Sequence, residues 1–270
     1  MRLRSGLAAA CALAAFLAAG CSRNPGIVFQ GYIEGEYVYI APPVGGTLTN
    51  LAVARGSHVK TGQLLFILDR SPQAAELRAA EKNLAQARAN LALAQAEYVR
   101  RVNLRAVQRV ISAEELDRAR ADRDAAAARA GSMQANLDKA RWSWEQKAQY
   151  APANAFVQDT LYRPGEWVPA GSPVVVLLPP ANIKVRFFVP EPWLARLHAG
   201  EVVAVTFDGM PHPCSATIHY ISSEAEFTPP VLYNRQNRAN LIYMMEGSFS
   251  AADAPQLRPG QPVDVAVNSP

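Results

Sequence analysis

The sequence predicts an α+β chain with three parts: a split β-sandwich, a long antiparallel α-helical coiled-coil hairpin inserted into it, and a small β-barrel after it. Three observations support this prediction. A β-rich motif occurs twice, about eighty alanine-rich residues separate its two copies, and the last third alternates apolar and polar residues.

The repeated motif reads Gly-x-x-Val-x-x-Gly and is followed each time by a short apolar run, at residues 56–62 and again at 165–171. Each copy predicts two glycine turns, an inward-pointing valine and flanking strands. The turn glycines are Gly56, Gly62, Gly165 and Gly171. Neither half can bury its apolar face alone, so residues 38–71 and 150–180 should close on each other as one sandwich.

The segment between the copies, residues 72–149, has the spacing of two long helices. Apolar residues of its first arm recur three and four positions apart, which is typical of a coiled coil. They are Leu77, Ala80, Leu84, Ala87, Leu91, Ala94 and Tyr98. The second arm continues the pattern with Leu116, Ala119, Ala126, Ala130, Met133, Leu137, Ala140 and Trp144. Arg123 interrupts this second seam.

The turn between the arms is marked by a capping box, Ser112-Ala113-Glu114-Glu115. In this motif the serine hydroxyl accepts a hydrogen bond from the Glu115 amide, and the glutamate accepts one from the Ser112 amide. The second helix should therefore begin at Ser112, with the hairpin tip near residues 109–111. An arm of about 37 residues would be roughly 55 Å long, which suggests that the hairpin reaches another molecule.

Residues 1–20 have the features of a leader removed on export: two arginines, an apolar run too short for a bilayer span, and small residues at its end. The small residues stand directly before Cys21, and this arrangement resembles a bacterial lipobox. The resemblance implies that Cys21 is acylated and holds the protein on a membrane. The alternative is an ordinary cleaved leader, with Cys21 incidental.

Cysteine and charge content exclude several classes of site. Cys11 lies in the leader and Cys21 would carry lipid, so Cys214 has no partner for an intramolecular disulfide. His212 and His219 lie near Cys214 without a further Cys or carboxylate, so we expect an ordinary barrel strand there and no metal site. After residue 20, the chain has 25 basic and 23 acidic residues, which gives no basis for nucleic-acid binding.

No catalytic or cofactor motif is present. The chain has no Gly-x-Ser-x-Gly elbow, phosphate-binding loop or His-Glu-x-x-His sequence, and its four histidines are scattered. We therefore expect neither an enzyme nor a cofactor.

The two-copy pattern resembles the halves of a biotinyl/lipoyl domain. Split by a helical hairpin and placed behind a lipoprotein-like leader, it resembles the HlyD-type membrane fusion proteins, or periplasmic adaptors. Residues 183–190 and 201–207 alternate like barrel strands, and 257–265 resembles the family's closing Leu-x-Pro-Gly-x-x-Val strand. Residues 223–230 resemble the Ala-Glu-Phe-Thr-Pro segment of adaptors that serve certain ABC exporters. Residues 21–37 would then form a linker or strand, and residues 181–270 the barrel domain.

The resemblance implies a periplasmic protein that couples an inner-membrane exporter, of ABC type, to an outer-membrane channel, with six copies around the channel. The alternatives are an adaptor of a proton-driven RND pump and an envelope scaffold lipoprotein without a transporter. The coupling role favours an inner-membrane anchor, whereas Ser22 after the cysteine leaves both membranes open.

The resemblance also assigns a channel contact to the hairpin tip. Many such adaptors carry an Arg, a Leu four residues later and a Ser seven after that. Arg100 and Leu104 have the spacing between the Arg and the Leu. Arg101 and Ser112 have the spacing of eleven residues between the Arg and the Ser, but Arg105 then stands where the Leu is expected. The predicted contact residues are Arg100, Arg101, Leu104, Arg105, Val110, Ile111 and Ser112.

Overall fold

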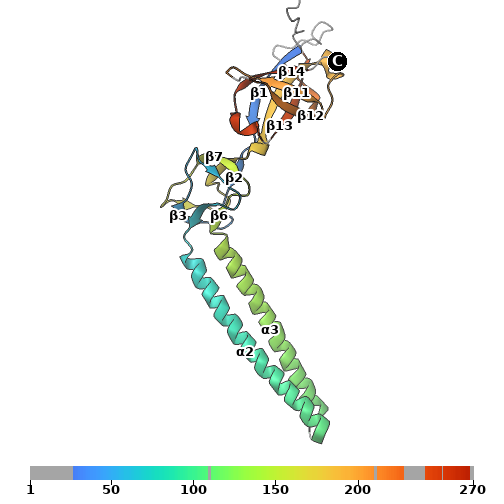
Figure 1. Cartoon of the computed structure of the whole chain (residues 1–270). Helices are drawn as coiled ribbons and strands as arrows, with labels where there is room; N and C mark the ends of the chain where they lie inside the picture. Colours follow the sequence, from blue (N-terminus) through green and yellow to red (C-terminus); the bar gives the residue numbers. More distant parts are fainter. Residues whose placement is uncertain (1–26, 109–110, 210–211, 228–240, 251, 268–270) are drawn as a thin grey trace, which may run out of the picture. The chain divides into compact units, whose positions relative to one another are not determined.

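The computed structural model describes residues 27–108, 111–209, 212–227, 241–250 and 252–267. The described residues form two compact units, one within residues 37–179 and one that combines residues 27–36 with the described residues from 180 onward. A β-sandwich with a helical hairpin makes up the first unit, and a β-barrel the second (Figure 1). Within the described ranges, no helix has the length and hydropathy that crossing a bilayer requires.

The sandwich is built from eight short strands. They are β2 (Val38–Ile40), β3 (Gly46–Leu51), β4 (His58–Val59), β5 (Leu64–Leu68), β6 (Ala148–Tyr150), β7 (Ala155–Thr160), β8 (Trp167–Val168) and β9 (Val175–Leu178). One sheet has the order β2-β9-β7-β4 and the other β6-β5-β3-β8. Strands β2 to β5 belong to the first copy of the repeat and correspond, in the same order, to β6 to β9 of the second. If each strand is replaced by its counterpart in the other copy, the order of the first sheet becomes the order of the second. Both copies therefore contribute to both sheets, and the predicted single sandwich is confirmed.

The motif residues have the predicted roles within this sandwich. The central valines, Val59 and Val168, are buried in its apolar core. The four turn glycines have φ values of 86, 77, 97 and 78° in sequence order, and a Cβ at any of them would meet no atom within 4 Å. Backbone conformation and not lack of space therefore accounts for glycine at these turns.

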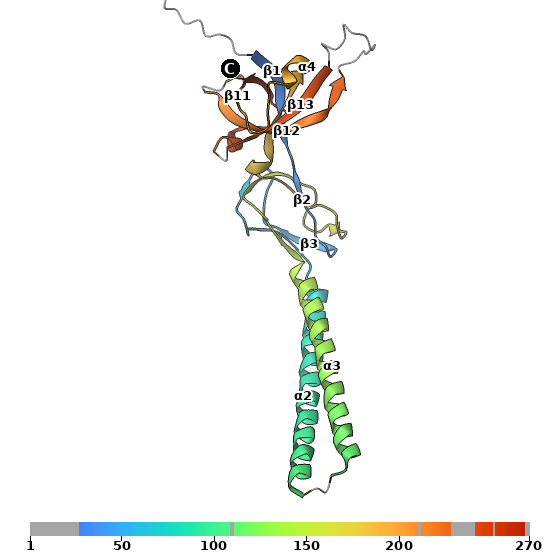
Figure 2. The ribbon, with the colours of Figure 1, turned by 90° about the vertical axis from the view of Figure 1, so that its right-hand side faces the viewer.

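The hairpin consists of α2 (Ser71–Gln108) and α3 (Ala113–Glu145), which run side by side in opposite directions (Figure 2). The most deeply buried positions along it all belong to the predicted seams: Leu84, Ala87, Ala119, Ala130 and Leu137. The guanidinium of Arg123, which interrupts the second seam, lies 4.5 Å from the centroid of the Tyr98 ring. A cation–π contact therefore accommodates this charge between the helices.

The predicted end of the helical segment needs a correction. The sequence assigned residues up to 149 to the hairpin, but α3 ends at Glu145 and residues 148–150 form β6. Strand β6 pairs antiparallel with β5, with Ala148 opposite Ile67. No glycine or proline separates the helix from this strand, so the local sequence did not mark the boundary.

The barrel has six strands in the closed order β1-β10-β13-β12-β11-β14. They are β1 (Ile27–Gly35), β10 (Ile183–Pro190), β11 (Val202–Thr206), β12 (Cys214–Phe227), β13 (Leu241–Phe249) and β14 (Pro262–Val267). The division at residue 181 was thus incomplete, because β1 lies between β10 and β14 and closes the barrel. At Gly31 of β1 a Cβ would come within 2.4 Å of the Arg186 carbonyl oxygen, so the pairing of β1 with β10 requires glycine there.

An ion cluster links three neighbouring barrel strands. The Glu246 carboxylate on β13 is 2.6 Å from Lys184 Nζ and 2.8 Å from Arg186 Nη2, both on β10. Arg186 Nη2 also lies 2.8 Å from Glu34 on β1. Burial raises the pKa of the Glu246 carboxyl, but the hydrogen bonds from Lys184 and Arg186 outweigh this and leave it lowered. The negative charge on buried Glu246 is therefore compensated, as a buried charge must be.

The interlocked sandwich should fold without the hairpin. When a short Gly/Ser linker replaces residues 72–145, we expect a soluble protein with a β-type circular dichroism spectrum and one cooperative unfolding transition. Strands β5 and β6 are paired neighbours, so their free ends lie about 5 Å apart and a short linker can join them. Removing residues 72–149 deletes β6 as well and should lower the thermal midpoint. A shortened chain of the first kind without any transition would contradict the interlocked sandwich.

Candidate functional site

The residues predicted to make contacts at the tip lie on two elements. Arg100, Arg101, Leu104 and Arg105 belong to the last turns of α2, and Ile111 and Ser112 lead into α3. Val110, like the proposed lipidation site Cys21, lies outside the described residues. The hairpin therefore brings together the tip residues that the structure describes.

Ser112 begins α3 as predicted. Its Oγ accepts a hydrogen bond from the Glu115 amide at 3.1 Å, and Glu115 Oε2 accepts one from the Ser112 amide at 3.0 Å, which completes the capping box. The backbone and hydroxyl hydrogen bonds from Ser112 lower the pKa of the Glu115 carboxyl. The cap alone accounts for serine at this position.

The three arginines near the tip have different surroundings. Arg100 donates a hydrogen bond to Glu97 at 2.9 Å. Arg101 is half-buried, and its charge contributes to the lowered pKa of the Glu115 carboxyl. Arg105 is exposed and pairs with no acidic group among the described residues. An acidic residue in place of Arg101 would stand beside Glu115, so a charge reversal there would disturb the tip itself.

The tip half of α2 also exposes apolar side chains. Val107 is 82% exposed, Leu93 65% and Leu104 37%. With Glu97 and Arg100, these three side chains form a series along α2 in which successive members are four, three, four and three residues apart. We call Leu93, Glu97, Arg100, Leu104 and Val107 the outer stripe. Such spacing keeps side chains on one face of a helix and is the spacing of a coiled-coil seam.

Leu93, Arg100 and Val107 of the outer stripe lie on the side of α2 away from the seam that packs on α3. Leu93, Arg100 and Val107 follow the inner seam positions Leu91, Tyr98 and Arg105 by two residues, which corresponds to a rotation of about 200° around the helix. Glu97 and Leu104 follow seam positions by three residues and lie at the edge of this face, nearer to α3. Eighteen residues earlier, or five whole turns, the same face carries Ala75, Ala79, Lys82, Gln86 and Ala89. Larger apolar side chains thus occupy this face only in the tip half, and pairing with α3 does not explain them.

The sequence reasoning identified Arg100 and Leu104 but missed Leu93 and Val107. The available signal was a second 3–4 spacing on α2, two residues out of phase with the first. Two further valines near the tip, Val99 and Val102, are 44% and 37% exposed. Valine has a lower helix propensity than alanine, so its use at exposed positions in an alanine-rich helix could also have been noted.

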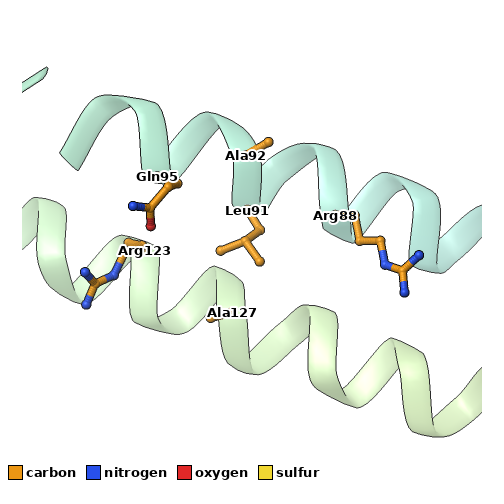
Figure 3. Close-up of a pocket in the computed structure, with 6 residues that line it drawn as sticks. All are labelled: Arg88, Leu91, Ala92, Gln95, Arg123 and Ala127. Atoms are coloured by element: carbon orange, nitrogen blue, oxygen red, sulfur yellow. The ribbon is translucent and has the colours of Figure 1, made fainter. Parts of the chain in front are cut away.

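A shallow groove of about 540 Å³ runs between α2 and α3 (Figure 3). Its lining residues are Arg88, Leu91, Ala92, Gln95, Arg123 and Ala127. Arg88 donates a hydrogen bond to Gln134 at 2.8 Å, and Arg123 stacks on Tyr98. Both arginines are thus engaged within the hairpin, and the small side chain of Ala127, which faces Leu91 in Figure 3, accounts for the hollow.

Cys214 and the nearby histidines do not form a common site. Cys214 is buried at the start of β12, whereas His219 is exposed and His212 precedes the strand. His219 follows Cys214 by five positions, an odd number, so along a strand their side chains point to opposite faces. In the described part of the chain, no three His, Cys, Asp or Glu side chains converge as a metal site would require.

Comparisons with known proteins agree with this architecture. A family profile described as "RND MFP, alpha-helical hairpin domain" matches residues 76–147. The chain is 31% identical to the UPF0194 membrane protein YbhG of Salmonella gallinarum, over 91% of this chain and 90% of that protein. Two solved structures share its fold. The membrane fusion protein Spr0693 of Streptococcus pneumoniae R6 has a TM-score of 0.66 at 19% identity, over 90% of this chain and 99% of that one. MacA of Actinobacillus actinomycetemcomitans has a TM-score of 0.61 at 20% identity, over 90% and 79%. The chain therefore belongs to the membrane fusion protein family, in the group of the UPF0194 membrane proteins.

Proposed function

We propose that this membrane fusion protein is a lipid-anchored periplasmic adaptor that couples an inner-membrane exporter to an outer-membrane channel and performs no catalysis. The observation that carries the proposal is the outer stripe on α2. Leu93 and Val107 are 65% and 82% exposed, so packing within the hairpin does not account for them. Exposed apolar side chains at coiled-coil spacing fit a helical surface of another protein.

The exporter is of the ABC type in this proposal. Residues 223–230 support it, because they resemble the Ala-Glu-Phe-Thr-Pro segment of adaptors that serve such exporters. Their first five residues end the long strand β12, and the rest lie outside the described residues. ATP hydrolysis would take place in a different subunit.

A proton-driven RND exporter is the second candidate, and one observation favours it. The profile that matches residues 76–147 is described as the hairpin domain of RND adaptors. Purification of the intact protein with its inner-membrane partner distinguishes the two. An ATP-binding subunit with its permease supports the ABC type, and a single large permease without an ATP-binding subunit supports the RND type.

Photo-crosslinking in living cells tests the channel contact. With a photoreactive amino acid at Val107, we expect a crosslink to an outer-membrane protein, identified by mass spectrometry. Gln86 is the matched control, since it is exposed on the same face of α2 three heptads closer to the root. No crosslink from Val107 in actively exporting cells, or the same outer-membrane product from both positions, would contradict docking at the tip.

A further inference from the structure

The root of the hairpin is connected to the sandwich by two very short segments. Strand β5 ends at Leu68 and α2 begins at Ser71, while α3 ends at Glu145 and β6 begins at Ala148. The two arms therefore continue directly from a pair of neighbouring strands. Strand β5 is held on both sides, by β6 and β3, whereas β6 is the edge strand and pairs with β5 alone. An edge strand bends and twists more easily than an inner one, so contacts outside the strand pairing help to restrict the movement of α3 at the root.

Two kinds of contact are present at the root. The first joins the arms to each other: the Leu68 amide donates to the Lys147 carbonyl at 2.8 Å, and the Arg70 guanidinium lies 4.7 Å from the centroid of the Trp144 ring. The second joins the arms to residues 45–47, at the start of β3. On the side of α2, the Asp69 amide donates to the Thr47 carbonyl at 2.7 Å.

On the side of α3, the contact is made by a buried lysine. The Lys147 side chain is 3% exposed, and its Nζ donates a hydrogen bond to the Gly45 carbonyl at 2.6 Å. Burial lowers the pKa of Lys147, and the charges of Asp69 and Glu76 act against this. Burying an ammonium group is costly unless it has a partner, so its presence at this position calls for a role beyond filling space.

The neighbouring glycine is adapted to this lysine. A Cβ on Gly46 would lie 2.7 Å from Lys147 Nζ, while its next contact, Leu68 Cβ, would be 3.5 Å away. Glycine at position 46 therefore leaves the space through which the ammonium group reaches the Gly45 carbonyl.

We propose that Lys147 is a positioning residue that fixes the direction in which the hairpin leaves the sandwich. With its hydrogen bond in place, both arms are tied to the same segment, residues 45–47. Without it, the Asp69 amide and the pairing of β5 with β3 still hold the side of α2, but the side of α3 loses its hydrogen bond to that segment and the hairpin can tilt. The length of α2 amplifies such a movement, because a tilt of about 10° at the root shifts the tip of a 38-residue helix by roughly 10 Å.

Distance distributions between two spin labels test this proposal. The labels replace Lys60 in the sandwich and Ala89 on the outer face of α2, both exposed, in the full-length protein with Cys214→Ser as the common background. Lys147→Met retains most of the side-chain stem but removes the ammonium group. We expect this change to broaden the label-to-label distribution about twofold through the leverage of the helix, with helicity by circular dichroism unchanged.

A second variant reaches the same contact without altering the lysine. Gly46→Ala places a methyl group 2.7 Å from the position of Lys147 Nζ, too close for both to remain, and we expect the same broadening. Combining both changes should broaden the distribution no further, because each removes the same hydrogen bond. Lys139→Met, at an exposed position on α3, is the matched control and should leave the distribution as it is.

The outcomes separate positioning from a purely stabilising role. If Lys147→Met or Gly46→Ala lowers the thermal midpoint while the folded protein keeps a narrow distribution, Lys147 only contributes stability and the proposal is wrong. If Lys147→Met does not fold, the width of the distance distribution in Gly46→Ala alone tests the proposal: a broad distribution supports it and a narrow one contradicts it. Broadening with Lys139→Met as well would overturn the proposal, because loss of any lysine would then loosen the root.

Discussion

Loss of the lipid on Cys21 should move the protein from the membrane fraction into the periplasmic fraction. The change is Cys21→Ala, combined with an ordinary cleavable leader in place of residues 1–20, so that an uncleaved leader does not act as an anchor. Each buried methylene of an acyl chain contributes about 0.8 kcal/mol to membrane binding, and a cysteine with several chains is held firmly. Fractionation followed by immunoblotting measures the shift.

The control for this experiment is Cys214→Ala. Cys214 is buried in the barrel, so its replacement tests whether the loss of any cysteine alters the location. We expect the control to stay in the membrane fraction, where intact mass should show acyl groups on the amino-terminal cysteine. A Cys21→Ala protein that remains with the membranes, together with a wild-type mass that includes no lipid, would remove the case for an anchor.

The sandwich and the hairpin could be predicted because their signals lie within short stretches of sequence. Two copies of Gly-x-x-Val-x-x-Gly indicate two equivalent halves, and heptads indicate which side chains of α2 and α3 meet. The capping box depends on Ser112 and Glu115, three residues apart, and was therefore predicted to the residue.

Contacts between distant residues were harder to predict. Strand β1 closes the barrel by pairing Gly31 with Phe187, more than 150 residues away, and nothing in residues 27–35 specifies that partner. The hydrogen bond from Lys147 to Gly45 spans 102 positions. In its local sequence Lys147 is one more basic residue, two positions after the last residue of α3. Its burial results from the packing of the hairpin root against the segment before β3.

The outer stripe was missed for a different reason. Heptad analysis assigns apolar residues to the strongest seam, and on α2 that seam faces α3. Leu93 and Val107 stand two residues out of phase, so they read as tolerated surface positions until the structure shows how exposed they are. A helix that carries large apolar side chains outside its main seam is typical of a surface that packs against a second partner.

Two acidic substitutions in the outer stripe should abolish export. Leu104→Asp with Val107→Asp removes two apolar side chains whose burial in a partner would contribute about 2 kcal/mol each. The loss of both would weaken docking by roughly 1,000-fold. Val107 is 82% exposed and away from α3, and Leu104 is 37% exposed at the edge of that face, so helicity and membrane location should be unchanged and the thermal midpoint should fall modestly. Export by cells that carry only the variant, compared with wild type, is the measurement.

The matched control is Gln86→Asp with Ala89→Asp. These residues stand eighteen positions before Leu104 and Val107, which is five whole helical turns, so the same charges enter the same face of α2 nearer the root. We expect normal export from this control, because that face carries no large apolar side chains there. Equal loss of export in both variants would mean that acidic charge anywhere on α2 is harmful. Normal export with the tip variant would show that Leu104 and Val107 are not part of the contact with the channel.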